Sequence, residues 1–171
     1  ALGKFLEEGG NILAMIDPET KSGIDSLLAI WNVRLNRDMV IETHASFVLT
    51  SQGLSRQSNV SVAPASAEYG EHMITKNFRF ATSFIKTQSL AVIDEDNESV
   101  ETTPLVYTSR NSWGETDLDM LFDENKVVKD EEDYEGPTTV AMAVEKSSGN
   151  KTRLVVMGDS DFASDVYVEQ A

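Results

Sequence analysis

The sequence predicts a single α/β domain over residues 1–171, built as a three-layer sandwich in which helices cover both faces of a mostly parallel, mixed sheet. Short apolar runs of strand length alternate along the chain with stretches whose apolar residues recur at helical spacing. The chain has the length of one ordinary domain, and no repeat or linker divides it. One core is therefore expected.

The first predicted elements are a helix and a strand. The apolar residues of 2–6 have helical spacing, and Gly9-Gly10 predicts a left-handed helix stop. The continuous apolar run 11–16 is typical of a strand that is buried on both faces, and Asp17-Pro18 ends it. Because the chain begins inside a helix and not with a strand, we expect it to be a fragment of a longer protein from which a preceding strand is missing.

A second helix and a second strand follow. Apolar residues over 24–31 recur at i, i+3, i+4 and i+7, and 39–41 has the composition of a strand. The segment 43–76 is polar and weakly periodic, so we expect it to be irregular apart from a short strand near 60–62. Helices that alternate with buried strands favour a parallel or mixed sheet.

Strand candidates continue to the end of the chain, at 78–80, 89–93 and 105–108, with the acidic run 94–98 as a solvated loop. The last two strands are predicted at 138–144 and 153–157. They are separated by Ser147-Ser148-Gly149-Asn150, which is typical of a hairpin loop, so a C-terminal antiparallel hairpin is expected.

Charge and composition exclude several classes of function. Lys plus Arg number 14 and Asp plus Glu number 29, which gives a net charge of −15. Such a field repels phosphate groups, so nucleic acid and anionic lipid surfaces are poor partners. The absence of cysteine excludes disulfides, thiolate metal sites and cysteine nucleophiles within the chain. The longest apolar runs are far shorter than the ~20 residues that a bilayer requires, so any membrane contact is expected through segments outside this chain.

The sharpest motif, residues 158–162, directly follows a predicted strand, and ligands in open α/β sheets bind at the carboxyl ends of strands. Gly-Asp-Ser at this place is similar to the nucleophile segment of GDS(L)-type esterases, with Ser160 as the nucleophile and a histidine as its base. Those enzymes carry the tripeptide early in the chain. Here it lies near the end, and neither His44 nor His72 is placed beside it by the sequence.

The two carboxylates of the same motif have a second interpretation. Asp159 and Asp161 could bind a hard cation, or they could cap a short helix that begins after the strand. Two carboxylates make a weak metal site, so the capping role is favoured. No metal or cofactor is predicted.

A polar loop after the strand candidate 105–108 is the other candidate binding segment. Its tryptophan could contact a ligand or simply pack over the sheet edge. If the strands concerned run parallel, this loop, Asp17 and the 158–162 motif line one crevice. The candidate ligand-binding residues are Asp17, Ser109, Arg110, Asn111, Trp113, Asp159, Ser160 and Asp161.

Several short passages in a fixed order give the chain a family resemblance. These passages are Leu6-Glu7-Glu8-Gly9-Gly10-Asn11-Ile12-Leu13, Ile16-Asp17-Pro18, His72-Met73-Ile74-Thr75, Val106-Tyr107-Thr108-Ser109, Ser112-Trp113-Gly114-Glu115, Gly136-Pro137 and the stretch 153–162. On these residues the chain resembles the auxiliary components of bacterial ABC transport systems of the gliding-motility (GldG) type. Met73 departs from the pattern, which has proline there.

The resemblance implies a non-catalytic domain with a class I glutamine amidotransferase-like or flavodoxin-like fold. It implies a place on the periplasmic, extracytoplasmic side of the bacterial inner membrane, with ABC transporter permease and ATPase subunits as partners. The amidotransferases attack with a cysteine, which this chain lacks. The alternative function is a hydrolase that uses Ser160, or a metal-dependent activity at Asp159 and Asp161.

Overall fold

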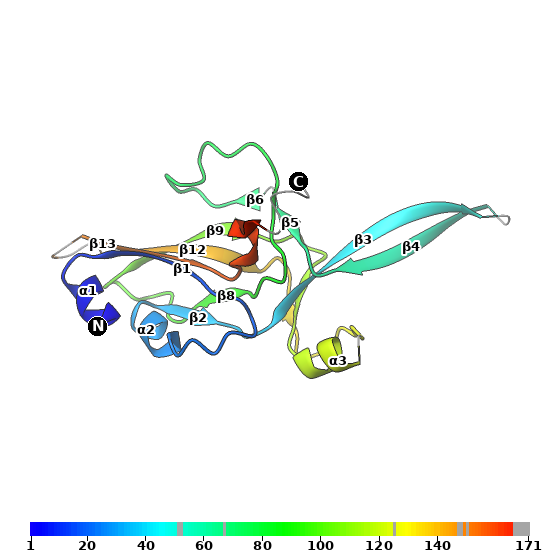
Figure 1. Cartoon of the computed structure of the whole chain (residues 1–171). Coiled ribbons are helices and arrows are strands. Elements are labelled where there is room, and N and C mark those ends of the chain that lie inside the picture. The colour runs from blue at the N-terminus through cyan, green and yellow to red at the C-terminus, as the bar shows by residue number, and fades with distance from the viewer. Residues whose placement is uncertain (51–52, 67, 125, 147–148, 150, 166–171) are drawn as a thin grey trace.

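The structure is a computed structural model that describes residues 1–50, 53–66, 68–124, 126–146, 149 and 151–165, and it is mostly β (Figure 1). Its helices are short. They are α1 (Leu2–Glu7), α2 (Asp25–Ile30), α3 (Leu118–Asp123) and the 3₁₀ turn η1 (Asp161–Ala163). The strands are β1 (Asn11–Met15), β2 (Val33–Leu35), β3 (Met39–Thr50), β4 (Gly53–Ser61), β5 (Ala65–Ser66), β6 (Glu68–Tyr69), β7 (Thr82–Ser83), β8 (Leu90–Val92), β9 (Glu101–Tyr107), β10 (Trp113–Glu115), β11 (Tyr134–Glu135), β12 (Thr139–Lys146) and β13 (Thr152–Met157).

The strands form one large sheet and two smaller ones. The seven-stranded sheet has the order β1-β13-β12-β8-β2, with β9 also paired to β12 and β6 paired to β9. A four-stranded sheet has the order β11-β10-β3-β4, and β5 pairs with β7. Among the strand pairs of the described residues, β1–β13 is parallel and the others are antiparallel.

The predicted three-layer α/β sandwich, with its amidotransferase-like or flavodoxin-like fold, is wrong. The described residues form a curled mixed sheet and a separate antiparallel sheet, and the three α-helices have six residues each. Apolar runs predict strands, but they do not show which elements cover them. Here the short helices α1 and α2 pack on one face of the large sheet, and strand and loop residues form the cluster on its other face.

Strand β1 lies at an edge of the large sheet, so the prediction that it is buried on both faces is also wrong. Leu13 and Met15 are 58% and 38% exposed, whereas Ala14 on the opposite face is buried. A continuous apolar run is therefore compatible with an edge strand that leaves one apolar face open.

The first part of the segment predicted to be irregular, residues 43–61, instead belongs to a long hairpin that projects from the body of the molecule (Figure 1). Strands β3 and β4 pair in one continuous register from Glu42↔Ser61 to Thr50↔Gly53. The strand predicted at 39–41 is confirmed as the buried start of β3. The strand predicted at 78–80 is wrong, because these residues lie in a loop with Phe80 84% exposed.

Several predicted elements are confirmed. Helix α1 ends before Gly9, which has the left-handed φ of 96° that glycine tolerates, and α2 and β8 lie in their predicted segments. The C-terminal antiparallel hairpin is confirmed from Ala141↔Met157 to Lys146↔Thr152. Three residues of its predicted loop, at 147, 148 and 150, lie outside the described residues.

The main core lies between the large sheet and the two N-terminal helices. Leu6 of α1 and Leu28 of α2 are fully buried against Leu154 and Val156 of β13 and Val144 of β12. Two further clusters lie apart from it. One covers the other face of the sheet around Phe84 and Val140, and the other joins the start of β3 to β10 and α3.

Leu28→Ala should destabilise the protein by about 2–5 kcal/mol, because it removes a fully buried side chain that holds α2 on the sheet. Ile30→Ala in the same helix is the matched control. Its side chain is 72% exposed, so its effect should stay within about 0.5 kcal/mol. Urea unfolding followed by circular dichroism measures both. Equal losses in the two variants would contradict this packing of α2.

Candidate functional site

The parallel pair β1–β13 brings two of the predicted site segments together. Because the two strands are parallel, their carboxyl ends lie at the same end of the sheet. Asp17 follows β1 there, and the 158–162 motif follows β13. The Ser160 amide donates to Asp17 Oδ1 at 2.6 Å, and the Ser160 hydroxyl donates to Asp17 Oδ2 at 2.7 Å. Both oxygens of Asp17 therefore hold the residue that the sequence singled out as a candidate nucleophile.

Asp159 is fully buried and ties two loops together. Its Oδ2 accepts from the Ile85 amide at 2.7 Å, and its Oδ1 accepts from the Asp161 amide at 2.6 Å, where η1 begins. Gly158 allows this close approach, because a Cβ atom there would lie 1.9 Å from the carbonyl oxygen of Gln88. Asp159 therefore holds the turn that leads into η1, whose N-cap residue Ser160 makes no side-chain cap hydrogen bond.

Neither the hydrolase mechanism at Ser160 nor the metal site at Asp159 and Asp161 finds the partner groups it requires among the described residues. Ser160 has an aspartate partner and no histidine partner among them. His72 lies in another loop, where its Nδ1 accepts from the Ile74 amide at 3.2 Å, and the side chain of His44 is outside the described part. No group of three or more His, Cys, Asp or Glu side chains among the described residues is arranged to hold a metal ion.

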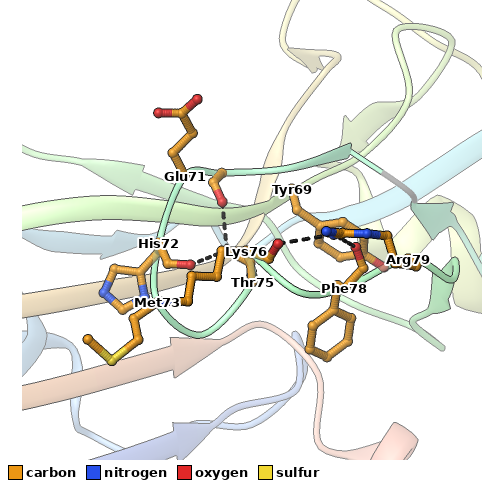
Figure 2. A pocket seen from close by; sticks show the side chains of 9 residues that line it. Tyr69, Glu71, His72, Met73, Thr75, Lys76, Phe78 and Arg79 are labelled. Atoms are coloured by element: carbon orange, nitrogen blue, oxygen red, sulfur yellow. Dashed lines mark hydrogen bonds between the residues drawn. The ribbon is translucent and has the colours of Figure 1, made fainter.

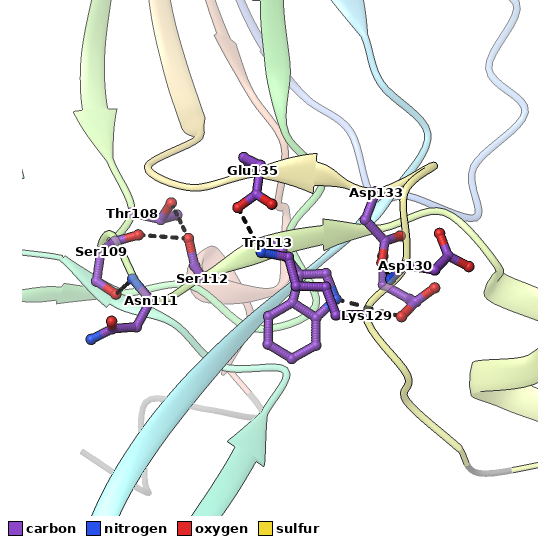
Figure 3. A network of polar contacts seen from close by, with 10 residues as sticks. Thr108, Ser109, Asn111, Ser112, Trp113, Lys129, Asp130, Asp133 and Glu135 are labelled. Atoms are coloured by element: carbon purple, nitrogen blue, oxygen red, sulfur yellow. Dashed lines mark hydrogen bonds and ion pairs between the residues drawn. The ribbon is translucent and has the colours of Figure 1, made fainter.

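The second predicted segment is a turn held by its own hydrogen bonds (Figure 3). The Ser109 hydroxyl donates to Glu42 Oε1 at 2.7 Å and accepts from the Asn111 amide at 3.0 Å. The Ser112 hydroxyl donates to the carbonyl of Ser109 at 2.8 Å and shares a hydrogen bond of 2.7 Å with Thr108 Oγ1. The turn is thus fixed to the base of the long hairpin through Glu42.

The side chains of this turn divide into a buried and an exposed group. Trp113 is 6% exposed and packs with Met39, Ile41 and Leu121, so it belongs to a core cluster, as the packing interpretation predicted. The neighbouring Arg110 and Asn111 side chains are exposed. Of the ligand-binding residues predicted in this loop, these two are the ones that a partner can reach.

The two predicted segments each form a polar pair, Asp17 with Ser160 and Ser109 with Glu42. Strands β9 and β13 are both antiparallel to β12, so their loops leave the sheet at the same end. Within the described residues, however, no hydrogen bond joins the Asp17–Ser160 pair to the Ser109–Glu42 pair.

Sequence reasoning missed the buried carboxyls of Asp38 and Glu42, although these residues flank the apolar triplet 39–41 and that position was a usable signal. Glu42 Oε2 is buried without a hydrogen-bond partner. Asp38 accepts from the Ser89 amide at 2.7 Å and from the Ser89 hydroxyl at 2.5 Å, which joins the start of β3 to β8.

A surface cavity of about 660 Å³ lies within the loop after β6 (Figure 2). It includes the His72–Thr75 passage of the family resemblance, together with Lys76 and Arg79. The loop closes on itself, because the Thr75 hydroxyl donates to the carbonyl of Gly70 at 2.6 Å and Arg79 donates to the carbonyl of Lys76 at 3.0 Å. The cavity is therefore local to this one loop.

The sequence was compared with known protein families. All of residues 1–171 match the family described as an ABC-type uncharacterized transport system, ABC_transp_aux. The chain belongs to this family. Membership makes it an auxiliary component of an ABC transport system and indicates a membrane-related location. None of the helices in the described residues is long and apolar enough to cross a membrane.

Among solved structures, this ABC_transp_aux chain is similar to the "mmIFT52 N-terminal domain", with a TM-score of 0.53 and 17% sequence identity. The alignment covers 99% of this chain and 62% of that one, so the chain spans less than two thirds of its structural relative. At this identity the likeness shows the fold alone. No curated protein matches the sequence.

Asp159→Ala should destabilise the protein by about 1–3 kcal/mol, because it leaves the Ile85 and Asp161 amides without their acceptor. Asp161→Ala is the matched control from the same motif and should cost less than about 0.5 kcal/mol. Urea unfolding measures both. If Ca²⁺ or Mg²⁺ raises the melting temperature of the wild type, and both variants abolish that increase, the capping role is wrong and a metal site is present.

A pH-dependent effect on stability is expected at Asp38. Burial raises the pKa of its carboxyl above the ordinary 3.8, the Ser89 hydrogen bonds oppose this, and Asp133 adds to it. A group whose pKa is raised on folding stabilises the protein below its ordinary pKa and loses that contribution as the pH rises through the folded pKa. Asp38→Asn should therefore gain stability relative to wild type as the pH rises from 3.8, the ordinary pKa, toward neutrality. Urea midpoints across this range test the sign, and a relative loss of stability with rising pH would contradict it.

Proposed function

We propose that this chain is a non-catalytic, extracytoplasmic domain of a GldG-type ABC transport auxiliary protein, and that it works by contacting another subunit. The match of the whole chain to the transport auxiliary family carries this proposal. The site geometry supports it, because the polar groups at the strand ends are engaged in holding loops. Asp17 holds Ser160, and Asp159 holds Ile85.

The turn at 109–112 is the part of the candidate site best suited to contact a subunit. Its backbone is fixed by the hydrogen bonds of Ser109 and Ser112, so it presents Arg110 and Asn111 with little conformational entropy left to lose on binding. Arg110 is also an exposed cation in a chain of net charge −15, and it can form a charge-assisted hydrogen bond with a carboxylate.

The expected partners are the permease and ATPase subunits of the same transport system. In this arrangement the domain lies on the periplasmic side of the bacterial inner membrane and is tethered through segments outside this chain. The permease is the subunit that the turn can reach, because an ATPase acts on the cytoplasmic side. We infer that the ATPase is held through the permease.

The test is co-purification of the tagged full-length protein with the permease and ATPase from detergent-solubilised membranes. The double variant Arg110→Ala/Asn111→Ala should reduce permease recovery at least about fivefold, which corresponds to about 1 kcal/mol. Lys21→Ala, an exposed cation outside the turn, is the matched control and should recover wild-type amounts. Undiminished recovery with the double variant would exclude this turn as the contact. A wild-type protein that retains neither subunit would contradict the proposed role itself.

A further inference from the structure

The free edge of β1 presents unpaired backbone groups. Strand β1 pairs with β13 on one side only, and the Ile16 amide donates to the carbonyl of Met157 at 3.0 Å. In a parallel ladder, alternate residues face the neighbouring strand. Residues 12, 14 and 16 therefore direct their backbone groups toward β13, while Asn11, Leu13 and Met15 direct theirs away from the sheet.

These outward amides and carbonyls are available in the described part of the chain, because no described residue forms a hydrogen bond with them. They extend over a strand of five residues whose pairing with β13 is regular from Asn11↔Arg153 to Met15↔Met157. This is one donor and one acceptor at every second residue, which is the pattern that an added strand requires.

The side chains at the free edge of β1 also favour the addition of a strand. Leu13 and Met15 are 58% and 38% exposed and lie in register beside Val155 and Met157, which are half-buried on the same face. An added strand would cover this apolar strip with its own alternate side chains.

The devices that usually protect a sheet edge are missing here. The sequence Asn-Ile-Leu-Ala-Met contains no proline and no charged residue, and the pairing shows no bulge. Edges without such devices are templates for a further strand. The edge of β1 is uncharged and apolar, although the whole chain has a net charge of −15, and it is therefore suited to pairing with a further β-strand.

A second copy of this chain is a poor occupant because of charge. Antiparallel self-pairing centred on Leu13 would bring the residues before β1 in one copy close to those after β1 in the other. The first group contains Lys4, Glu7 and Glu8, and the second contains Asp17, Glu19 and Lys21, so each carries one net negative charge. The like-charged ends would meet, in addition to the repulsion between two copies of −15 each.

We propose that β1 binds an extended segment of another protein by strand addition, and that this segment has apolar residues at alternate positions and Lys or Arg at its ends. Backbone hydrogen bonds to Asn11, Leu13 and Met15 supply the affinity, and the apolar strip and the negatively charged ends supply the selectivity. This contact goes beyond the proposed function, because it uses a different surface from the turn at 109–112.

The experiment uses the purified chain and a fluorescein-labelled peptide, Lys-Val-Thr-Val-Thr-Val-Lys, and measures binding by fluorescence anisotropy. Saturable binding is expected, together with slower hydrogen exchange at the Leu13 and Met15 amides. Leu13→Lys should weaken binding at least about tenfold, because it places a charge in the apolar strip. Ile30→Lys makes the same change at an exposed site in α2 and should keep the affinity within about twofold.

Two control peptides separate the sources of binding. Proline in place of the central valine removes an amide and should abolish binding, and Glu in place of both lysines should weaken it. The proposal is overturned by a lack of saturable binding, by equal binding of the proline peptide, or by wild-type affinity in Leu13→Lys. A concentration-dependent dimer that Leu13→Lys dissociates would assign the edge to a second copy instead. Arg110→Ala/Asn111→Ala should bind the peptide normally, so failure of this test is distinct from failure of the proposed function.

Discussion

The central strand β12 is the element on which the rest of the structure depends. Its residues Val140–Val144 are at most 3% exposed, and its backbone pairs with β9 along one edge and with β13 and, at Thr139, β8 along the other. Burial of both faces and both edges makes it the most constrained segment of the chain. Both candidate site loops follow strands that pair directly with it, so β12 fixes where the polar groups at the sheet end lie.

The sequence predicted this centre well because its signals are local. The runs at 138–144 and 153–157 are close in sequence and joined by a loop with a clear hairpin composition, and the structure pairs them. The contact between Asp17 and Ser160 also follows from the expected parallel strands, although its chemical role does not. The sequence predicted that the 158–162 loop follows a strand, and the structure shows which groups its carboxylates bind.

The errors share one physical cause, which is that a pattern reports burial and not the identity of the neighbour. The run at 11–16 has the composition of a central strand, yet among the described strands β1 has a neighbour on one side only. Residues 43–61 lack strong apolar alternation, which led to the irregular prediction, yet they form a hairpin that projects from the body of the molecule (Figure 1). Trp113 looked accessible among polar neighbours, but tertiary packing against Met39 and Leu121 buries it.

The projecting hairpin has a mechanical consequence. Strand β3 runs without interruption from Met39, Val40 and Ile41, which are inaccessible to solvent, to Thr50 near the far end, and β4 pairs with it at nine consecutive positions. Glu42 lies where this two-stranded ribbon leaves the body, and Ser109 is attached there. One unbroken strand therefore connects the far part of the hairpin with the interior and, through Glu42, with the turn that carries Arg110, so that a force on the hairpin would act on both.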